Sequence, residues 1–336
     1  MAVTTEGARA EEPSGSGVSP IMAASPAELA ETFEAVAANV ALAFVGDKET
    51  VRLAVCCLMA EGHLLVEDYP GVGKTTLAKA LARSLGLGFG RVQFTADLLP
   101  SDITGAVVID RQHGELRFRG GPVFTNVLLA DELNRASPKA QSALLEAMEE
   151  RQVSVDGTSH LLPRPFMVVA TQNPYDAAGT FPLPHSQLDR FLMRLSVGYP
   201  DRAGEDELLA AAGNRPVPEL LSAVAGDEFV LAFAACLQHV HVTPPVRAYV
   251  LDIVAATRNH PDLAIGASPR AALAVVRLAS AMALVAGRDF VIPDDVKRVV
   301  GPALAHRLLA HVAGSADEAL THILERVPVP VPGGTR

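Results

Sequence analysis

One short stretch limits what this chain can fold into more than any other. Residues 67–76 read EDYPGVGKTT and directly follow the apolar run HLLV, which predicts a strand, a glycine-containing turn and then a helix over residues 75–84. Such a turn directs backbone N–H groups and the amino end of a helix at phosphate oxygens. The usual pattern is G-x-x-x-x-G-K-[ST], and Asp68 stands where that pattern has its first glycine. The stretch therefore predicts a phosphate-binding loop with one departure.

The side chains of this loop have separate expected roles. Lys74 is expected to reach the outer phosphates of a nucleotide, and the Thr75 hydroxyl to bind Mg²⁺. The alternative is an ordinary turn followed by a helix start. The binding residues predicted for the loop are Pro70, Gly71, Val72, Gly73, Lys74, Thr75 and Thr76.

An acidic pair ends the next strongly apolar run, NVLLADELNR. Asp131 is expected to hold Mg²⁺ through water, and Glu132 to orient and deprotonate the water that attacks the terminal phosphate. Two carboxylates at the end of a strand are also an ordinary loop start. The loop about sixty residues upstream favours the catalytic interpretation, since phosphoryl transfer needs both features.

Three further polar residues are candidates for the same site. Asn173 ends the run FMVVATQN, where its amide is expected to contact the terminal phosphate or the attacking water, although Asn-Pro is also a good turn starter. Arg190 in LDRF and Arg270 in SPR are candidates because guanidinium charge near the terminal phosphate assists phosphoryl transfer. An isolated arginine is more often solvated or paired with a carboxylate.

The chain divides into regions of different character. Residues 1–24 are rich in Glu, Gly, Ser and Pro and predict a disordered tail. From residue 25, where Ser-Pro predicts a helix start, to residue 199, apolar strands alternate with helices, which predicts an α/β domain with a parallel sheet covered on both faces. Residues 200–336 are rich in alanine and leucine and predict an all-helical second domain.

Composition excludes several classes of protein. The net charge of −10 and the pI of about 5.5 argue against a general nucleic-acid surface, which needs clustered Lys and Arg. The three cysteines lack metal-ligand spacing, and the start of the chain lacks a signal-peptide pattern, so a reduced cytoplasmic protein is expected. Residues 271–287 are apolar but contain Arg277, so a buried helix is expected and no membrane insertion.

Together these residues resemble the AAA+ ATPases and, within them, the MoxR family. The stretches that carry the resemblance run from about residue 44 to residue 331 and include EDYPGVGKTTLAKALA, FRGGPVFTNVLLADELNRASPKAQSALLEAMEERQVSVDG, VVATQNPYDAAGTFPLPHSQLDRFLMRL and GASPRA. The family often has Glu-Asp before its loop, so Asp68 departs from the general pattern without departing from the family. The resemblance implies a P-loop nucleotide-binding core followed by a helical lid.

The resemblance also implies a role for each candidate residue. Residues 70–76 resemble the Walker A loop, Asp131 and Glu132 the Walker B pair, and Asn173 the first sensor. Arg190 is similar to the arginine finger that acts on the ATP of a neighbouring subunit, and Arg270 is similar to the second sensor on the lid. The pair Val45 and Gly46 resembles the segment near the adenine.

Two insertions are expected in the α/β domain. Residues 95–125 contain turn signals and two strand-like runs, 106–109 and 115–118, which match the second-helix insertion of this AAA+ clade. Residues 152–155 and 158–161 flank Asp156-Gly157, a strong two-residue hairpin signal. In related rings such hairpins face the pore or a partner, so we favour partner contact over plain surface packing.

The resemblance implies an ATPase that uses ATP and Mg²⁺ in a homo-oligomeric ring, most simply a hexamer. It suggests chaperone-like remodelling or activation of other proteins, often with a partner that has a von Willebrand factor A-type domain. The alternatives are a metal-insertion motor like magnesium chelatase, a nucleic-acid motor, and a nucleotide-gated scaffold that hydrolyses weakly. Acidic composition disfavours the nucleic-acid motor, and Glu132 disfavours the scaffold.

Overall fold

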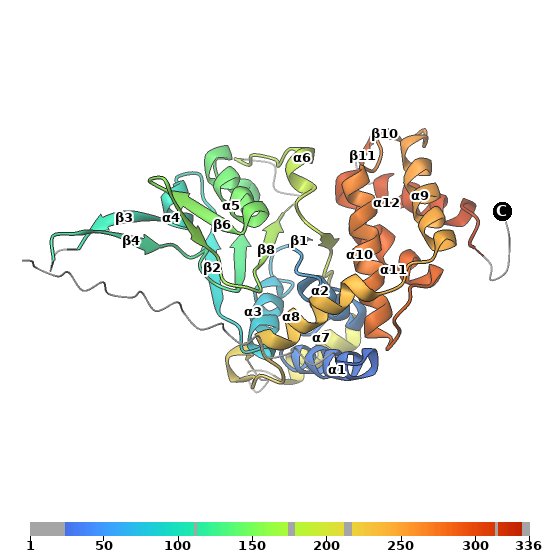
Figure 1. The fold of residues 1–336 in the computed structure, drawn as a ribbon, viewed down its shortest axis with the longest axis horizontal. Helices are drawn as coiled ribbons and strands as arrows, with labels where there is room; N and C mark the ends of the chain where they lie inside the picture. Colours follow the sequence, from blue (N-terminus) through green and yellow to red (C-terminus); the bar gives the residue numbers. More distant parts are fainter. Residues whose placement is uncertain (1–23, 111–112, 174–178, 212–216, 313–314, 331–336) are drawn as a thin grey trace, which may run out of the picture.

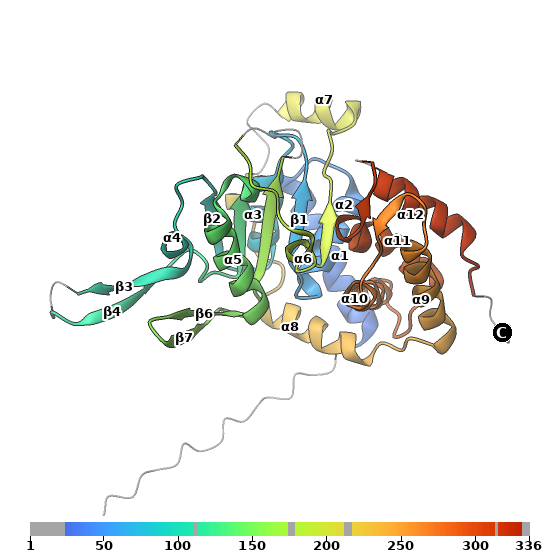
Figure 2. The same ribbon diagram turned by 90° about the horizontal axis from the view of Figure 1, so that it is seen from above.

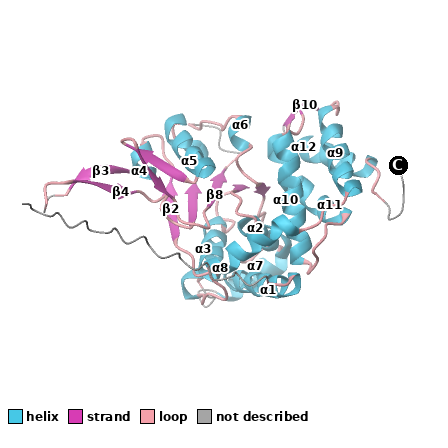
Figure 3. Cartoon of the chain, in the orientation of Figure 1, coloured by secondary structure: helices cyan, strands magenta, loops and turns pink. Residues whose placement is uncertain are grey.

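A five-stranded parallel sheet forms the centre of the α/β part (Figures 1 and 3). The computed structural model describes residues 24–110, 113–173, 179–211, 217–312 and 315–330. The strands lie in the order β2-β5-β8-β1-β9 and pair in parallel throughout. Their bounds are β1 (Leu64–Glu67), β2 (Phe89–Gln93), β5 (Val127–Asp131), β8 (Met167–Gln172) and β9 (Met193–Leu195). The sequence predicts all five within a few residues.

Both faces of this sheet are covered, as its apolar strands predict. Alternate residues of β1 point to opposite faces, so Leu64 and Val66 pack with the core shared by α1 (Pro26–Ala43), α2 (Lys48–Met59) and α3 (Lys74–Ser84). Leu65 packs on the other face with Leu144 of α5 (Pro138–Glu150). The sheet is therefore buried on two sides, and its strand ends remain for a site.

Helix starts follow the capping signals in the sequence. Ser25 caps α1, because its hydroxyl accepts from the Glu28 amide while the Glu28 carboxylate accepts from the Ser25 amide. The Ser137 hydroxyl caps α5 by accepting from the Ala140 amide, with Pro138 in the first turn. These caps fix where two of the helices that cover the sheet begin.

Two antiparallel hairpins project from the α/β part on the same side (Figure 2). The first is β3 (Gly105–Ile109) with β4 (Leu116–Gly120), preceded by the short helix α4 (Pro100–Thr104). The second is β6 (Gln152–Val155) with β7 (Thr158–Leu161), joined by Asp156 and Gly157 with φ of 48° and 79°. Phe118 stacks on His160 with 3.8 Å between ring centroids, so the hairpins contact each other.

Helices dominate the rest of the chain, and those after residue 243 lie at the opposite end of the molecule from the first hairpin (Figure 1). After α6 (His185–Leu188), they are α7 (Arg202–Ala211), α8 (Asp227–Cys236), α9 (Pro244–Arg258), α10 (Pro269–Val285), α11 (Pro293–Leu304) and α12 (Ser315–Arg326). In the described part of the chain, short 3-10 turns lie between the longer elements: η1 (Leu133–Arg135), η2 (Pro218–Leu220), η3 (Leu237–His239) and η4 (Ala305–Arg307). A short antiparallel pair, β10 (Leu263–Ile265) with β11 (Leu309–Ala310), adds to the helical region that the sequence predicts.

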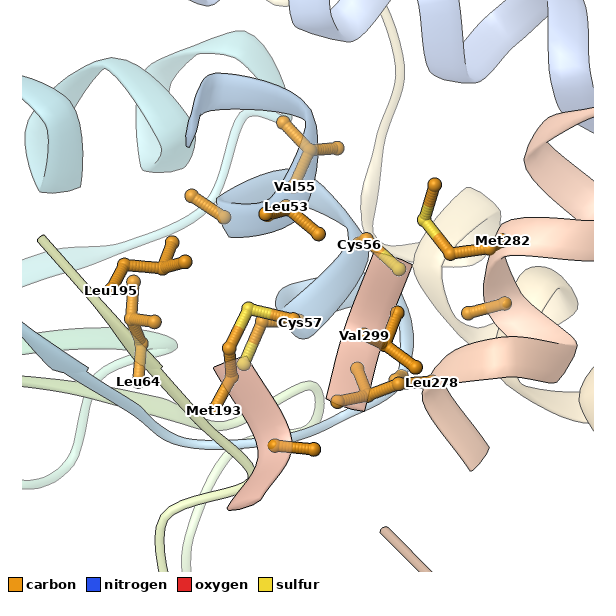
Figure 4. Packing of buried hydrophobic residues seen from close by; sticks show 14 of the residues in the cluster. Leu53, Val55, Cys56, Cys57, Leu64, Met193, Leu195, Leu278, Met282 and Val299 are labelled. Atoms are coloured by element: carbon orange, nitrogen blue, oxygen red, sulfur yellow. The ribbon is translucent and has the colours of Figure 1, made fainter. Parts of the chain in front are cut away.

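Helix α2 joins the sheet to this helical region (Figure 4). Cys57 lies beside Met193 of β9, and Cys56 lies on the side of Met282 of α10. Both cysteines are fully buried, and burial raises the pKa of the Cys56 thiol to about 12 and that of Cys57 well above its usual value. A thiol that stays protonated is a poor nucleophile and metal ligand, so the pair serves packing.

Within the described residues, no helix combines the length and the apolar character that a membrane crossing requires. Helix α10 carries the apolar run around Arg277 and packs inside the protein, as expected from its sequence.

Candidate nucleotide site and a separate arginine cluster

The predicted phosphate-binding loop lies between β1 and α3. Gly71 and Gly73 have φ of 86° and 90°, a left-handed conformation that glycine adopts without steric penalty. Gly73 is also the N-cap of α3, so the helix begins at Lys74 and its free amide groups face the loop. The backbone therefore has the shape that phosphate oxygens require.

Asp68, the departure from the usual loop pattern, has a structural role. Its side chain is buried, and Oδ2 accepts hydrogen bonds from Ser196 Oγ (2.9 Å) and from the amides of Val197 and Gly198 (both 2.6 Å). Burial alone raises the pKa of Asp68, but hydrogen bonds from Gly198, Tyr69 and Ser196 outweigh burial and leave the pKa below its usual value. A glycine here would lose this connection between the loop and the segment after β9.

The register of the sheet places the acidic pair beside its partners. Asp131 pairs with Gln93 of β2 and follows Ala130, which pairs with Ala170 of β8. Asp131 Oδ1 accepts from Thr171 Oγ1 at 2.6 Å, and Oδ2 accepts from Arg91 Nη2 at 2.8 Å. The carboxyl ends of three neighbouring strands therefore meet at Asp131.

Glu132 is held in an unusual backbone conformation. Its φ and ψ are 57° and 47°, in the left-handed region that residues with a Cβ rarely adopt. Its amide donates to Thr171 Oγ1 at 2.9 Å, its Oε2 accepts from Gln93 Nε2 at 2.8 Å, and Arg135 Nε lies 3.2 Å from the same oxygen. Two side chains, those of Gln93 and Arg135, thus hold one oxygen of the carboxylate.

The lysine of the loop lies near these carboxylates. Lys74 Nζ donates to the carbonyl oxygens of Asp68 (2.8 Å) and Tyr69 (3.1 Å). Burial lowers the pKa of Lys74, while the charges of Asp68, Asp131 and Glu132 act in the opposite direction. The structure therefore brings the phosphate loop and the acidic pair together, and their joint role as a nucleotide site stays a prediction. Asn173 directly follows β8 at the same edge.

The pair Val45 and Gly46 borders this site. The Phe44 ring lies against the loop, because a Cβ added at Gly73 would lie 3.2 Å from its Cε2 atom. On the other side, a Cβ at Gly204 of α7 would lie 3.0 Å from Val45 Cγ1. The segment expected near the adenine therefore lies between the loop and α7.

The two candidate arginines lie together at a different place. Arg190 Nε is 3.0 Å from Glu149 Oε2, and Arg270 Nη1 is 3.3 Å from Glu149 Oε1. Glu149 is near the end of α5, and Arg190 precedes β9. The Leu192 amide donates to the His63 carbonyl at 2.9 Å, which places the Arg190 segment beside the residues that enter β1.

The phosphate loop with its acidic pair and the two candidate arginines therefore occupy opposite edges of the sheet. Lys74 and Asp131 lie where strands end, whereas Arg190 and Arg270 lie where strands begin. Four strand residues span roughly 13 Å at about 3.3 Å per residue. Within one subunit, the structure does not bring either arginine to its own phosphate loop.

A cavity of about 880 Å³ surrounds the arginine pair. Glu61 pairs in it with Arg151 (2.9 Å) and Arg164 (2.7 Å), and hydrogen bonds from Arg164 lower the pKa of Glu61 to about 2 despite its burial. Carboxylates come from Glu61, Glu149 and Asp189. The arginines that line the cavity are Arg151, Arg164, Arg190, Arg270, Arg277 and Arg307. The excess of guanidinium groups favours contact with an anion.

Several site residues escaped the sequence prediction. Arg91 and Gln93 occupy alternate positions on β2, and this alternation of polar residues about Val92 is the signal that points to them. No such signal points to Glu149, because it is one of several glutamates in the helical stretch EAMEE. Its role depends on contacts with residues distant in sequence.

The donors at the carboxyl edge suit a nucleotide bound with Mg²⁺. The Thr75 hydroxyl and the Asp131 carboxylate are hard oxygen ligands of the kind Mg²⁺ takes. The described residues contain no group of three or more His, Cys, Asp or Glu that could hold a metal by themselves. A cation here would complete its ligand set with phosphate and water, which is typical of Mg²⁺ in nucleotide sites.

Comparison with known proteins agrees with this geometry. Residues 63–193 match the family described as ATPase family associated with various cellular activities (AAA), and residues 255–326 match the AAA lid domain. The first match contains the phosphate loop and the acidic pair, and the second contains Arg270.

Full-length relatives are also known. Chaperone MoxR1 of Mycobacterium tuberculosis is 39% identical over 95% of this chain and 90% of its own length, and YeaC of Bacillus subtilis is 44% identical over 85% and 91%. Protein MoxR of Paracoccus denitrificans is 34% identical over 79% and 84%. A crystal structure from Cytophaga hutchinsonii, described as an ATPase, superposes with a TM-score of 0.83 at 34% identity over 91% of this chain and 97% of that one. The chain therefore belongs to the MoxR family of AAA ATPases and is itself an ATPase.

Proposed function

We propose that this ATPase works as a cytoplasmic ring, most simply a hexamer, in which the carboxyl edge of one subunit faces the amino edge of the next. ATP and Mg²⁺ would bind at the loop of the first subunit, and Arg190 and Arg270 of the second would contact the terminal phosphate. The observation that carries this proposal is the separation of these arginines from the loop of their own chain. Guanidinium groups supplied in trans are an established aid to phosphoryl transfer.

In this arrangement the residues of the carboxyl edge have separate roles in binding and hydrolysing ATP. The loop amides bind phosphate oxygens, and Lys74 exchanges the carbonyls of Asp68 and Tyr69 for the outer phosphates. Glu132 orients the attacking water and accepts its proton, while Gln93 keeps the carboxylate in place. Mg²⁺, held by Thr75 and through water by Asp131, would neutralise charge on the phosphate oxygens.

The arginine pair changes partner in this proposal. Glu149 holds both guanidinium groups on the amino edge of the isolated chain. A neighbour's terminal phosphate carries more charge than one carboxylate, and Arg binds it in a forked geometry. Docking of the neighbour would therefore draw Arg190 and Arg270 from Glu149 toward the nucleotide.

The task for which the ring uses ATP hydrolysis is inferred from the relatives. MoxR1 carries the name of a chaperone, and we infer that this ring remodels or activates other proteins, including a partner with a von Willebrand factor A-type domain. The paired hairpins favour this inference because Ile109 and Leu116 are exposed apolar side chains at the tip of the first hairpin, and Leu161 is exposed on the second. Proteins retained by an ATP-loaded Glu132→Gln ring would identify the client, and stimulation of turnover by DNA would contradict a protein-directed function.

A mixing experiment tests the shared site. Glu132→Gln subunits are expected to bind ATP and keep their arginines, and Arg190→Ala subunits to keep an intact loop and acidic pair. Each variant alone should hydrolyse ATP at least about 100-fold more slowly than the unmodified protein, since each lacks one group that acts in the transition state. Mixed rings should recover part of the rate. Absence of recovery in oligomers shown to contain both subunits would contradict the proposal.

A further inference from the structure

A buried arginine of the helical region holds the segment that carries Arg190. Arg307 lies in η4, directly after α11, and its side chain is 5% exposed. Its Nη2 donates to the carbonyl oxygens of Phe191 (2.7 Å) and Asp189 (3.3 Å), and its Nε lies 3.1 Å from Asp189 Oδ1. One side chain thus binds both residues that flank Arg190.

Neighbouring contacts reinforce this hold. The adjacent His306 donates from Nε2 to the same Phe191 carbonyl at 3.0 Å. Phe191 itself is fully buried in the core of the sheet face that contains α5. The Arg190 segment is therefore fixed to η4 by its main chain, and to Glu149 only through the guanidinium of Arg190.

The placement of a buried arginine here calls for a reason other than stability. Transfer of a charged group from water into the interior is unfavourable, and an apolar side chain of similar volume is often at least as stabilising. Burial lowers the pKa of Arg307 to about 10, so the guanidinium remains charged at neutral pH and keeps its forked geometry. What the guanidinium provides is direction, because Nη2 binds the carbonyl oxygens of both residues that flank Arg190 and Nε forms an ion pair with the Asp189 carboxylate.

We propose that Arg307 is a positioning residue for Arg190, through which the helical region sets the direction of the arginine that acts on the neighbour's ATP. This role rests on the proposed function, in which Arg190 works in trans. Catalytic groups need placement within about 0.5 Å, and an error of about 1 Å lowers the rate by as much as roughly 100-fold. Movement of η4 relative to the sheet would therefore change hydrolysis in the next subunit.

Mixed rings separate this role from a general effect on folding. The donor subunit carries Glu132→Gln and supplies Arg190, and the acceptor subunit carries Arg190→Ala and supplies the loop. Arg307→Lys keeps the charge but removes the fork. Added to the donor, it should lower the restored kcat about tenfold with KM for ATP unchanged, because the acceptor loop is unmodified.

The same Arg307→Lys substitution in the acceptor is the matched control. The acceptor has no Arg190 to position, so the restored rate should not change. Equal losses with the substitution in either subunit would show a structural role and overturn the proposal, as would an unchanged rate with the substitution in the donor. If the donor and acceptor without any change at Arg307 fail to restore ATP hydrolysis, the shared site itself is overturned, and the positioning role with it.

A second variant covers the case in which Arg307→Lys does not fold. Asp189→Asn removes the carboxylate that pairs with Arg307 Nε. It leaves the sequence of the helical region unchanged. In the donor it should lower the restored rate about threefold, since the two carbonyl contacts of Arg307 remain. An equal effect in donor and acceptor, or none in the donor, would overturn the proposal.

Discussion

The two edges of the central sheet differ in how their charges are held. At the carboxyl edge, Asp131 and Glu132 are fixed by Thr171, Arg91 and Gln93, all from neighbouring strands. At the amino edge, Arg190 and Arg270 share one carboxylate, Glu149, from a helix end. The first arrangement is complete within the chain, whereas the second has guanidinium groups in excess. In the proposed ring, this contrast corresponds to a carboxyl edge that binds the nucleotide and an amino edge that offers charge to the neighbouring subunit.

The largest effect expected concerns the carboxyl edge alone. Lys74→Ala should weaken ATP binding at least about 100-fold, because an ammonium at the outer phosphates contributes several kcal/mol in a partly buried site. Isothermal titration with a slowly hydrolysed ATP analogue measures this change. Lys79→Ala is the matched control, since Lys79 lies on the same helix but pairs with Glu219 at 2.7 Å. Equal affinity of Lys74→Ala and unmodified protein would contradict the site.

The amino edge should respond differently. Arg270→Ala is expected to leave ATP affinity nearly unchanged in an isolated subunit and to lower ring turnover about 10- to 100-fold, because the arginine meets only the neighbour's phosphate. Steady-state ATPase assays at several protein concentrations measure the change. Arg298→Ala, which removes an exposed lid arginine 3.8 Å from Glu49, should have little effect. Loss of affinity in isolated Arg270→Ala subunits would place Arg270 at its own loop.

Sequence alone predicted one edge better than the other. The loop, the acidic pair and Asn173 lie in or next to strands whose ends a parallel sheet brings together, so local patterns were sufficient to predict that they lie together. The roles of these residues stay predictions. The two arginines were found one at a time, and their shared partner Glu149 was not found. Asp68 was identified as a departure, but its bonds to residues 196–198 depend on β9 lying next to β1. Contacts between distant segments leave no local signal.

The hairpins and domain bounds show the same distinction. Asp156-Gly157 predicted its hairpin because the turn chemistry is local. The stacking of Phe118 on His160 joins two insertions and could not be read from either. The pair β10–β11 was missed because strands of two and three residues have too little periodicity to detect. Bounds at residues 24 and 199 remain predictions.

Acid should destabilise the folded protein through two buried histidines at the amino edge, His63 and His306. Burial lowers the pKa of His63 to about 4 and that of His306, with the charge of Arg307 as a further cause, to about 3. Both histidines are neutral in the folded protein but bind protons near pH 6.5 when unfolded, so their stabilisation is complete above about pH 6.5 and lost as pH falls toward 4. Each should contribute a loss of about 2 kcal/mol in unfolding free energy by pH 5.

Urea unfolding at pH 7.5 and pH 5 tests this expectation. His63 accepts from the Val168 amide and donates to the Met148 carbonyl, so His63→Gln should be less stable at pH 7.5 but lose less stability on acidification. His239→Gln is the matched control, because that histidine lies outside both edges in η3. An unchanged pH dependence in His63→Gln would show that other groups cause the acid sensitivity.

The smallest expected effect is at Gln93, whose amide holds Glu132 Oε2 at 2.8 Å. Gln93→Ala should lower kcat about three- to tenfold with KM for ATP unchanged, because the carboxylate loses one of its two side-chain partners but keeps Arg135 and its backbone conformation. Gln93→Glu should lower kcat further, since it sets a second negative charge beside Glu132. Gln152→Ala, in the β6 strand, controls for loss of an amide elsewhere. A higher kcat in Gln93→Ala would mean that Gln93 restrains Glu132 and would contradict the positioning role of Gln93. The amino edge of a neighbouring subunit would then have two tasks, to release Glu132 from Gln93 and to supply guanidinium charge.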